Sequence, residues 1–292
     1  MPYFSIIIPT YNRSSTILKT IESVLSQTFQ NFEIIIIDDG STDNTFEEIE
    51  HLKTNKIIYK RQKNNERANA RNNGIALANG DYITFLDSDD LFYTAHLQIA
   101  YEAITTKNNP EVLHTRYEII DQDGKVIEKK NILDSNLNKN LISGNFMSCN
   151  GVFLRKDIAA SNLFNEDREL SGLEDWELWL RIASQYKIQY SNIITSAIVN
   201  HNSRSVLTTN KNELILRIKA LLKHVLMNKN VVNYYDSEFY KLKSSCYSYI
   251  ALHIALTKKD RLTTIKYLFK GIKENPKSLF SKRLFATLKH FI

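Results

Sequence analysis

Four consecutive isoleucines, Ile34 to Ile37, lie within an apolar run from Phe32 to Asp38. Side chains of a β-strand point alternately to the two faces of its sheet, so this run would present isoleucine on both faces. Strands that are apolar on both faces are typical of parallel sheets covered by helices on each side. The run therefore predicts an α/β protein with a central strand at 32–38.

The residues around this strand alternate between strand and helix patterns. Strands are expected at 3–9, 57–60 and 82–86, and helices at 14–27 and 68–78. Ser14 or Ser15 is the expected N-cap of the first helix. Repeated strand–helix–strand units predict a parallel, doubly wound sheet with helices on both faces.

Beyond Asp90 the pattern becomes mixed. Strands at 112–120 and 125–127 flank Asp123-Gly124, which predicts a hairpin turn, and a further strand is expected near 152–154. A helix follows with Trp176 and Trp179 on one side. We expect these tryptophans to be buried in the core, and the alternative is an exposed surface on which a sugar stacks. The sequence predicts one α/β domain over 1–208 and a helical region over 209–292 that packs on it.

Composition excludes several classes of site. The eight glycines fall in neither the G-x-G-x-x-G nor the G-x-x-x-x-G-K spacing, so a standard dinucleotide fingerprint and a P-loop are absent. Two cysteines, Cys149 and Cys246, are too few for a cysteine-rich zinc module, an iron–sulfur cluster or a disulfide scaffold, and they indicate reduced thiols in a cytosolic protein. The sequence shows neither a secretory leader nor an apolar stretch that could span a bilayer.

Positive charge is concentrated near the C-terminus. Residues 258–292 hold ten Lys and Arg against two acids, a balance of +8, whereas the other 257 residues hold 28 against 30, a balance of −2. This favours an anionic membrane surface over nucleic acid as a partner. The region also carries two apolar stripes, which suit either an interfacial helix or packing on the domain: Ile265, Leu268, Phe269 and Ile272, and Leu284, Leu288 and Phe291.

Polar residues follow three of the predicted strands. The segments are Pro9-Thr10-Tyr11-Asn12, Asp38-Asp39-Gly40-Ser41 and Asp87-Ser88-Asp89-Asp90. The carboxyl ends of parallel strands meet at one edge, where α/β proteins bind ligands. A divalent cation would relieve the repulsion among these carboxylates, and Asp87 and Asp89 could hold it by oxygen. The alternative is an Asx-turn, with Asp90 capping the next helix.

These motifs, together with Ala70-Arg71-Asn72-Asn73-Gly74, occur in the order and spacing of family 2 glycosyltransferases. The resemblance covers about residues 3 to 205. It implies the GT-A fold, a mostly parallel Rossmann-like sheet flanked by helices. It also implies transfer of a sugar from a nucleotide sugar to an acceptor hydroxyl, with inversion at the anomeric carbon. Residues 1–110 would then bind the nucleotide sugar and 111–208 the acceptor.

The resemblance assigns roles to individual residues. It places the nucleotide among Pro9, Thr10, Tyr11, Asp39, Arg71, Asp87 and Ser88, with Asp39 accepting from the base and Arg71 near the pyrophosphate and ribose. Asp87, Asp89 and His201 match the metal side. The alternatives are a solvated helix-face arginine at 71 and an ordinary loop histidine at 201. One departure is the segment Asn65-Glu66-Arg67, where many members have glycine.

Leu173-Glu174-Asp175-Trp176 is similar to the family's acidic acceptor motif. Inverting transfer needs a base for the acceptor hydroxyl, and a single positioned carboxylate is suited to that task. Asp175 is the predicted base, and Glu174 would position it or the acceptor. The alternative is a pair of acids that offset the dipole at a helix N-terminus.

The resulting hypothesis is a metal-dependent enzyme, using Mn²⁺ or Mg²⁺, that adds one sugar to a glycan or a lipid-linked glycan in surface polysaccharide synthesis. The family favours a UDP-sugar donor. A cytoplasmic protein, peripheral on the inner face of the plasma membrane, is expected. The absence of Gln-x-x-Arg-Trp disfavours a processive synthase. The rivals are a sugar nucleotidyltransferase and an inactive glycan-binding protein with the same fold.

Overall fold

The structure is a computed structural model that describes residues 1–292 apart from 53, 130–135, 202–209, 258–259 and 292. The predicted domain boundary at 208 lies outside the described residues. The strands are β1 (Phe4–Thr10), β2 (Phe32–Asp38), β3 (Ile57–Arg61), β4 (Tyr82–Phe85), β5 (Leu91–Phe92), β6 (Val112–Ile120), β7 (Val126–Lys129), β8 (Val152–Arg155) and β9 (Ile188–Val199).

The helices alternate with these strands at first and then follow one another to the C-terminus. They are α1 (Ile17–Leu25), α2 (Thr45–Glu50), α3 (Glu66–Leu77), α4 (His96–Thr106), α5 (Leu137–Asn140), α6 (Lys156–Ser161), α7 (Glu174–Ala183), α8 (Lys211–Met227), α9 (Lys229–Tyr235), α10 (Phe239–Thr257), α11 (Arg261–Glu274) and α12 (Lys282–Phe291). Among the described residues, no helix combines the length and apolar character that crossing a membrane requires.

Within the described chain, nine strands form a single sheet in the order β3-β2-β1-β4-β8-β6-β9-β5, with β7 added to β6. Strands β1 to β4 are mutually parallel, as predicted. Strand β8 is antiparallel to both β4 and β6, and β6 runs parallel to β9. The first half of the sheet is therefore parallel, and the second half is mixed.

The isoleucine run of β2 is buried on both faces of the sheet. Ile34 and Ile36 pack in the core cluster that includes residues of α1 and α4, whereas Ile35 and Ile37 pack in the cluster that includes residues of α3. All four side chains are fully buried. Because burial of one large aliphatic side chain contributes about 1.5–3 kcal/mol, this strand fixes the layering of the fold.

One glycine allows α3 to lie close to the sheet. A Cβ on Gly74 would lie 2.4 Å from Cγ2 of Ile7 on β1, well inside van der Waals contact. Helix α3 carries Arg71 one turn before this glycine, so the close approach also brings Arg71 over the carboxyl ends of the strands.

The expected elements are present, but two predicted helix caps are not. Helix α1 begins at Ile17 after Thr16, so neither Ser14 nor Ser15 is its N-cap. The hairpin forms, with Gly124 in the left-handed region at φ 83°. Asp90 does not cap a helix, because β5 lies between Asp90 and α4. Oδ1 of Asp90 accepts instead from the backbone N–H of Val199 at 3.0 Å.

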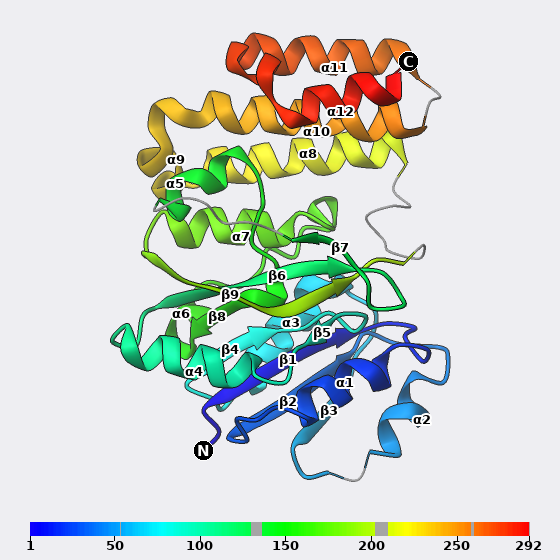
Figure 1. Cartoon of the computed structure of the whole chain (residues 1–292), viewed down its shortest axis with the longest axis vertical. Coiled ribbons are helices and arrows are strands. Elements are labelled where there is room, and N and C mark those ends of the chain that lie inside the picture. The colour runs from blue at the N-terminus through cyan, green and yellow to red at the C-terminus, as the bar shows by residue number, and fades with distance from the viewer. Residues whose placement is uncertain (53, 130–135, 202–209, 258–259, 292) are drawn as a thin grey trace.

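The helices after residue 210 form one end of the molecule, and β1–β3 with α1 and α2 form the other (Figure 1). Helix α8 packs on α7, and α10 packs against α8, α11 and α12. The predicted helical region is thus packed on the α/β domain. Both predicted core tryptophans, Trp176 and Trp179, are buried where α7 meets this region.

Candidate active site

Arg71 joins two carboxylates that lie 87 residues apart in the sequence, at positions 87 and 174. Its Nη2 donates to Oδ1 of Asp87 at 2.7 Å, and its Nη1 donates to Oε1 of Glu174 at 3.0 Å. The Arg71 side chain is 2% exposed and that of Glu174 is 4% exposed, whereas Asp87 retains 30%. A guanidinium presents its donors as a rigid fork, so one arginine can hold both carboxylates in fixed positions.

Glu174 occupies the first turn of α7 and is fixed from several directions. Its Oε2 accepts from the backbone N–H of Gly172 at 2.6 Å, and Oε1 also lies 3.5 Å from Nε of Arg67. The acids of this turn do lie at the positive end of the helix dipole, as the alternative interpretation requires. The contact with Arg71 goes beyond that interpretation, because it connects the turn to Asp87 on the loop after β4.

Asp175 has a different environment from its neighbour. Its Oδ1 accepts from the backbone N–H of Trp176 at 2.7 Å, and its Oδ2 accepts from Nδ2 of Asn145 at 2.9 Å. The side chain is half-buried. Desolvation, with the nearby charge of Glu174 as the second cause, raises the pKa of Asp175 to about 7. A carboxyl group with this pKa can exchange a proton near neutral pH.

Asp89 lies beside His201, as predicted. Nε2 of His201 is 2.9 Å from Oδ2 of Asp89, and Nη2 of Arg13 is 3.4 Å from the same oxygen. The side chains of Asp89 and His201 are only 13% and 8% exposed. A loop at the end of β4 and the residue shortly after β9 thus converge at this point.

A carboxylate oxygen paired with an imidazole nitrogen is a donor set that suits Mn²⁺. The arrangement therefore fits a divalent ion held by Asp89 and His201. The third predicted ligand, Asp87, is engaged by Arg71. In the part of the chain that is described, no three His, Cys, Asp or Glu residues gather closely enough to hold a metal by themselves.

The predicted nucleotide-binding residues lie at the carboxyl ends of β1, β2 and β4. Thr10 is buried, and its carbonyl accepts from the N–H of Asp39 at 2.8 Å. Oδ1 of Asp39 accepts from Nε2 of Gln62 at 2.7 Å and from the N–H of Asn65 at 2.9 Å. Pro9 is buried in β1, Tyr11 is exposed on the loop after β1, and Ser88 is buried between Asp87 and Asp89. Their contacts with a nucleotide stay predictions.

Sequence reasoning missed three residues at the site: Arg67, Asn145 and Cys149. Arg67 lies four residues before Arg71 on α3, and this spacing places both on one helix face; that signal could have identified it. Asn145 binds Asp175 from a loop without a recognisable motif. Cys149 is buried close to Arg71, and burial raises the pKa of its thiol, which stays protonated.

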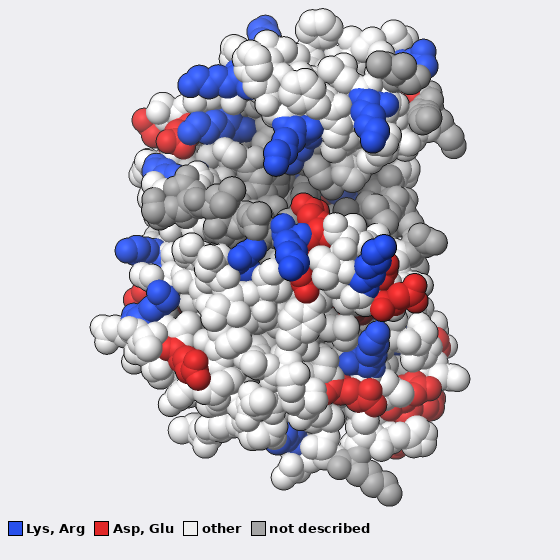
Figure 2. Space-filling model, viewed as in Figure 1, with Lys and Arg blue, Asp and Glu red and all other residues white. Residues whose placement is uncertain are grey.

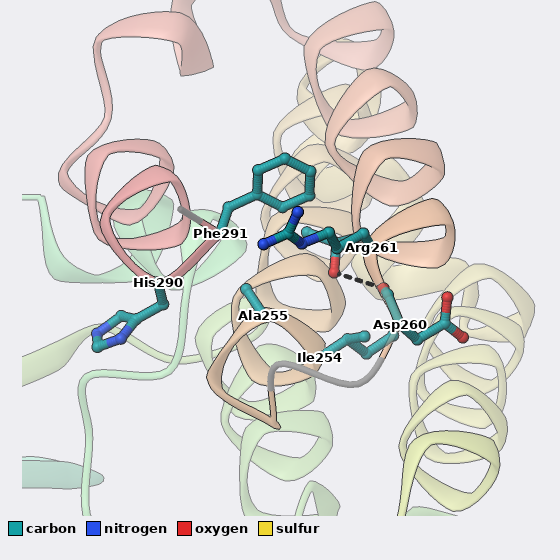
Figure 3. A pocket seen from close by; sticks show the side chains of 7 residues that line it. Ile254, Ala255, Asp260, Arg261, His290 and Phe291 are labelled. Carbon is teal, nitrogen blue, oxygen red and sulfur yellow. Dashed lines mark hydrogen bonds between the residues drawn. The ribbon is translucent and has the colours of Figure 1, made fainter.

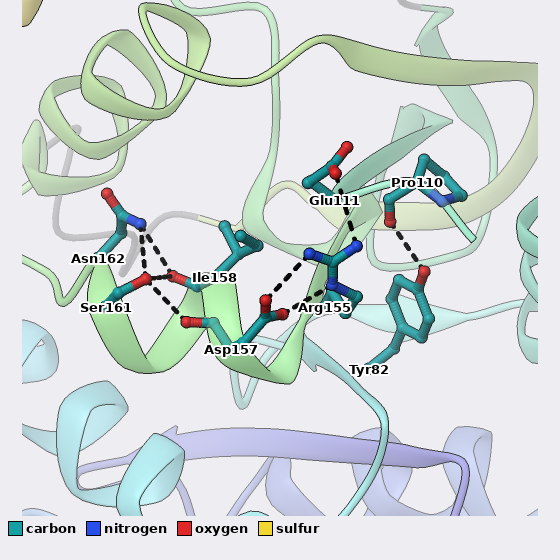
Figure 4. Close-up of polar contacts among 8 residues, drawn as sticks. All are labelled: Tyr82, Pro110, Glu111, Arg155, Asp157, Ile158, Ser161 and Asn162. Carbon is teal, nitrogen blue, oxygen red and sulfur yellow. Dashed lines mark hydrogen bonds and ion pairs between the residues drawn. The ribbon is translucent and has the colours of Figure 1, made fainter. Parts of the chain in front are cut away.

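A broad, shallow hollow lies at the opposite edge of the sheet, where Tyr3, Asp81 and Tyr82 mark the amino ends of β1 and β4. Figure 4 shows the polar contacts beside it. Arg155 pairs there with Asp157 at 2.7 Å and with Glu111 at 3.5 Å. None of the predicted site residues lies among these, so the site is not assigned to this edge of the sheet.

Comparison with known proteins identifies the family of this chain. The family described as Glycosyl transferase family 2 matches residues 5–160. An Escherichia coli protein, the UDP-Glc:alpha-D-GlcNAc-diphosphoundecaprenol beta-1,3-glucosyltransferase WfgD, is 32% identical over 211 residues, 71% of this chain and 80% of that protein. The chain belongs to glycosyltransferase family 2. A second relative, an uncharacterized glycosyltransferase of Rickettsia bellii, is 40% identical over 184 residues, which are 62% of this chain and 26% of that protein.

Solved structures show the same fold at low sequence identity. S. aureus TarS 1–349 in complex with UDP-GlcNAc superposes with a TM-score of 0.71 at 18% identity, over 100% of this chain and 89% of that one. The Pyrobaculum calidifontis mannosyltransferase PcManGT, in complex with GDP-Man and Mn²⁺, gives a TM-score of 0.62 at 16% identity, over 99% and 84% of the two chains. The fold shared with these structures thus includes the C-terminal helices as well as the sheet.

Proposed function

We propose that this protein transfers one sugar from a UDP-sugar, with inversion and with the help of a divalent ion, to a hydroxyl of a lipid-linked glycan acceptor. The observation that carries the proposal is the buried bridge from Asp87 through Arg71 to Glu174. It fixes the motif that the family resemblance assigns to the donor beside the motif that it assigns to the acceptor.

Asp175 would be the general base. In the reaction, the acceptor oxygen forms a bond to the anomeric carbon as the bond from that carbon to the diphosphate oxygen breaks, and Asp175 takes the hydroxyl proton. A base with a pKa near the working pH is the effective choice, and the raised pKa of Asp175 meets this condition. Glu174 is held by Arg71 and by the Gly172 N–H, so its proposed role is to position the site.

Arg71 would act as a positioning residue. Its guanidinium is buried and engaged by two carboxylates, which favours this role over the predicted contact with the pyrophosphate. Asp39 and Thr10 would hold the nucleoside at the ends of β1 and β2. Residues 1–110 would then bind the donor and residues 111–208 the acceptor.

Asp89 and His201 would hold Mn²⁺ or Mg²⁺, which, when bound, offsets the negative charge of the leaving diphosphate. The Mn²⁺ named with the Pyrobaculum enzyme supports the choice of a divalent ion. The UDP donor is supported by the UDP-Glc in the name of WfgD and by the UDP-GlcNAc bound to TarS.

The acceptor assignment rests on WfgD, which is named for a diphosphoundecaprenol-linked acceptor. An acceptor of this kind is anchored in a membrane, so the chain would work at a membrane surface. The rival nucleotidyltransferase would use a sugar phosphate and a nucleoside triphosphate. An inactive glycan-binding protein would consume neither a nucleotide sugar nor a nucleoside triphosphate.

A panel of UDP-sugars and GDP-mannose, with and without Mn²⁺ and with a diphosphate-linked GlcNAc acceptor, tests the proposal. The expected product carries the sugar with inverted anomeric configuration by NMR. In the Asp175→Asn variant, bound donor should still protect the protein against heat denaturation. The rate of sugar transfer should fall by about 100- to 10,000-fold. The matched control is Asp123→Asn, an exposed turn residue, which should keep full activity. Turnover with retained configuration, or full activity of Asp175→Asn, would refute the mechanism.

A further inference from the structure

Residues 261–291 present an unusual density of exposed apolar side chains. Six large apolar side chains between Arg261 and Phe291 are at least 42% exposed, which is the value for Leu288. The first 200 residues of the described chain also hold only six such side chains. Leu262, Phe269, Phe280 and Phe285 are the most exposed, at 83%, 68%, 84% and 61%. Large exposed apolar side chains that gather in one region mark an interaction surface.

These side chains lie on the outward faces of α11 and α12 and on the 3₁₀ turn Pro276–Phe280 between them. On α11, Thr264, Tyr267 and Gly271 are buried on the side that packs on α10, and the spacing of Leu262 and Phe269 puts them on the opposite side. The structure thus divides the predicted stripe, because Leu268 packs against the core and Phe269 points outward.

The inward side of α12 is fixed to the same helices. Nη1 of Arg283 donates to the carbonyl oxygen of Ser245 on α10 at 2.9 Å, and Thr287 is buried. Figure 3 shows Phe291 over the guanidinium of Arg261, and Arg261 Cζ lies 5.7 Å from the ring centroid. Phe285 and Leu288 therefore remain on the outward side.

The same segment carries most of the positive charge of the C-terminal region. Residues 261–291 hold eight Lys and Arg and one acid, Glu274, a balance of +7. The exposed lysines of this segment are Lys266, Lys270, Lys273, Lys277, Lys282 and Lys289. Figure 2 shows Lys and Arg side chains spread among uncharged residues on the helical end of the molecule. We call the outward side of residues 261–291 the basic apolar face.

We propose that the basic apolar face binds an anionic lipid bilayer, with the aromatic and leucine side chains inserted among the headgroups and the lysines paired with lipid phosphates. Apolar burial and attraction to anionic lipid are the two terms that hold an interfacial helix. The inference deepens the proposed function and rests on it in one respect: a lipid-linked acceptor has to be met at a membrane. Charge complementarity selects an anionic bilayer over a second copy of this chain, whose matching face is also basic.

Vesicle flotation of the full chain tests this surface directly. The protein should float with vesicles of phosphatidylglycerol and phosphatidylcholine, and should remain at the bottom with phosphatidylcholine alone. Attraction to an anionic surface is screened by salt, so flotation should decrease as the salt concentration rises.

Two double variants separate the contribution of apolar burial from that of attraction to anionic lipid. The double variant Phe269→Ser and Phe280→Ser should lower the partition coefficient about tenfold or more. The double variant Lys266→Glu and Lys273→Glu should lower it by at least about fivefold per lysine. The matched controls are Met227→Ser, a residue 72% exposed at the end of α8, and Lys19→Glu on α1, and both should bind like the unchanged protein.

Three outcomes would overturn the inference: no flotation of the unchanged protein with anionic vesicles, equal flotation of the Phe269/Phe280 variant, or a dimer in light scattering that this variant abolishes while vesicles are not bound. Release of UDP from UDP-glucose, measured without vesicles, distinguishes this failure from failure of the proposed function. The Phe269/Phe280 variant should release UDP at the unchanged rate, because these side chains are 68% and 84% exposed and are not among the site residues.

Discussion

Replacement of Arg71 by methionine is the most direct test of the buried bridge. Methionine keeps most of the side-chain length and removes the charge, so Glu174 loses its 3.0 Å partner and Asp87 its 2.7 Å partner. Removing one partner of a buried ion pair destabilises a protein by about 3–5 kcal/mol. Asp87 is 30% exposed and can regain water, and Glu174 keeps Arg67 at 3.5 Å. We therefore expect about 3 kcal/mol, the lower end of that range.

The matched control is Arg155→Met at the opposite edge of the sheet. Arg155 also contacts two carboxylates, but its side chain is 36% exposed and that of Asp157 is 62% exposed. Exposed ion pairs contribute about 0–1 kcal/mol, so this variant should lose no more than that. The two variants remove the same group from the same kind of triad and differ in burial.

Urea unfolding followed by tryptophan fluorescence is the assay. Both tryptophans of the chain lie on α7, directly after Glu174, so the signal reports on the element that the bridge holds. Arg71→Lys should lie between Arg71→Met and the unchanged protein, because an ammonium keeps the charge and cannot form the fork. If Arg71→Met loses no more stability than Arg155→Met, the bridge does not hold the two motifs together.

Three further predictions follow from the site and its support. The rate of transfer should decrease as pH falls through about 7, because the carboxylate of Asp175, with its raised pKa, becomes protonated there and can no longer act as a base. A pH–rate profile that is flat from pH 5 to 8 would exclude Asp175 as the base. Asp89→Ala and His201→Ala should each raise the Mn²⁺ concentration needed for half-maximal activity, and an unchanged metal titration would place the ion elsewhere. Gly74→Ala should lower the free energy of unfolding by about 1–3 kcal/mol, because its Cβ would lie 2.4 Å from Ile7; a thermal unfolding midpoint equal to that of the unchanged protein would contradict this.

The sequence by itself determined the layered α/β fold. The isoleucines of β2 have to be covered on both faces, and only a sheet with helices on each side does this. The polar segments after β1, β2 and β4 were expected to share one edge for a related reason, because parallel strands end together. These are local patterns, and local patterns can be read along the chain.

Only the tertiary structure decided which side chains of that edge contact one another. The sequence gives no measure of how deep Arg71 lies, and its two partners come from segments 16 and 103 residues away. The raised pKa of Asp175 likewise depends on desolvation and on the charge of Glu174, which the packing of α7 against the helical region sets. The apolar stripes near the C-terminus were visible in the sequence, but which of their residues face outward depended on how α11 and α12 dock on α10. Contacts between distant segments depend on the packing of the whole chain, and for that reason they could not be predicted from motifs alone.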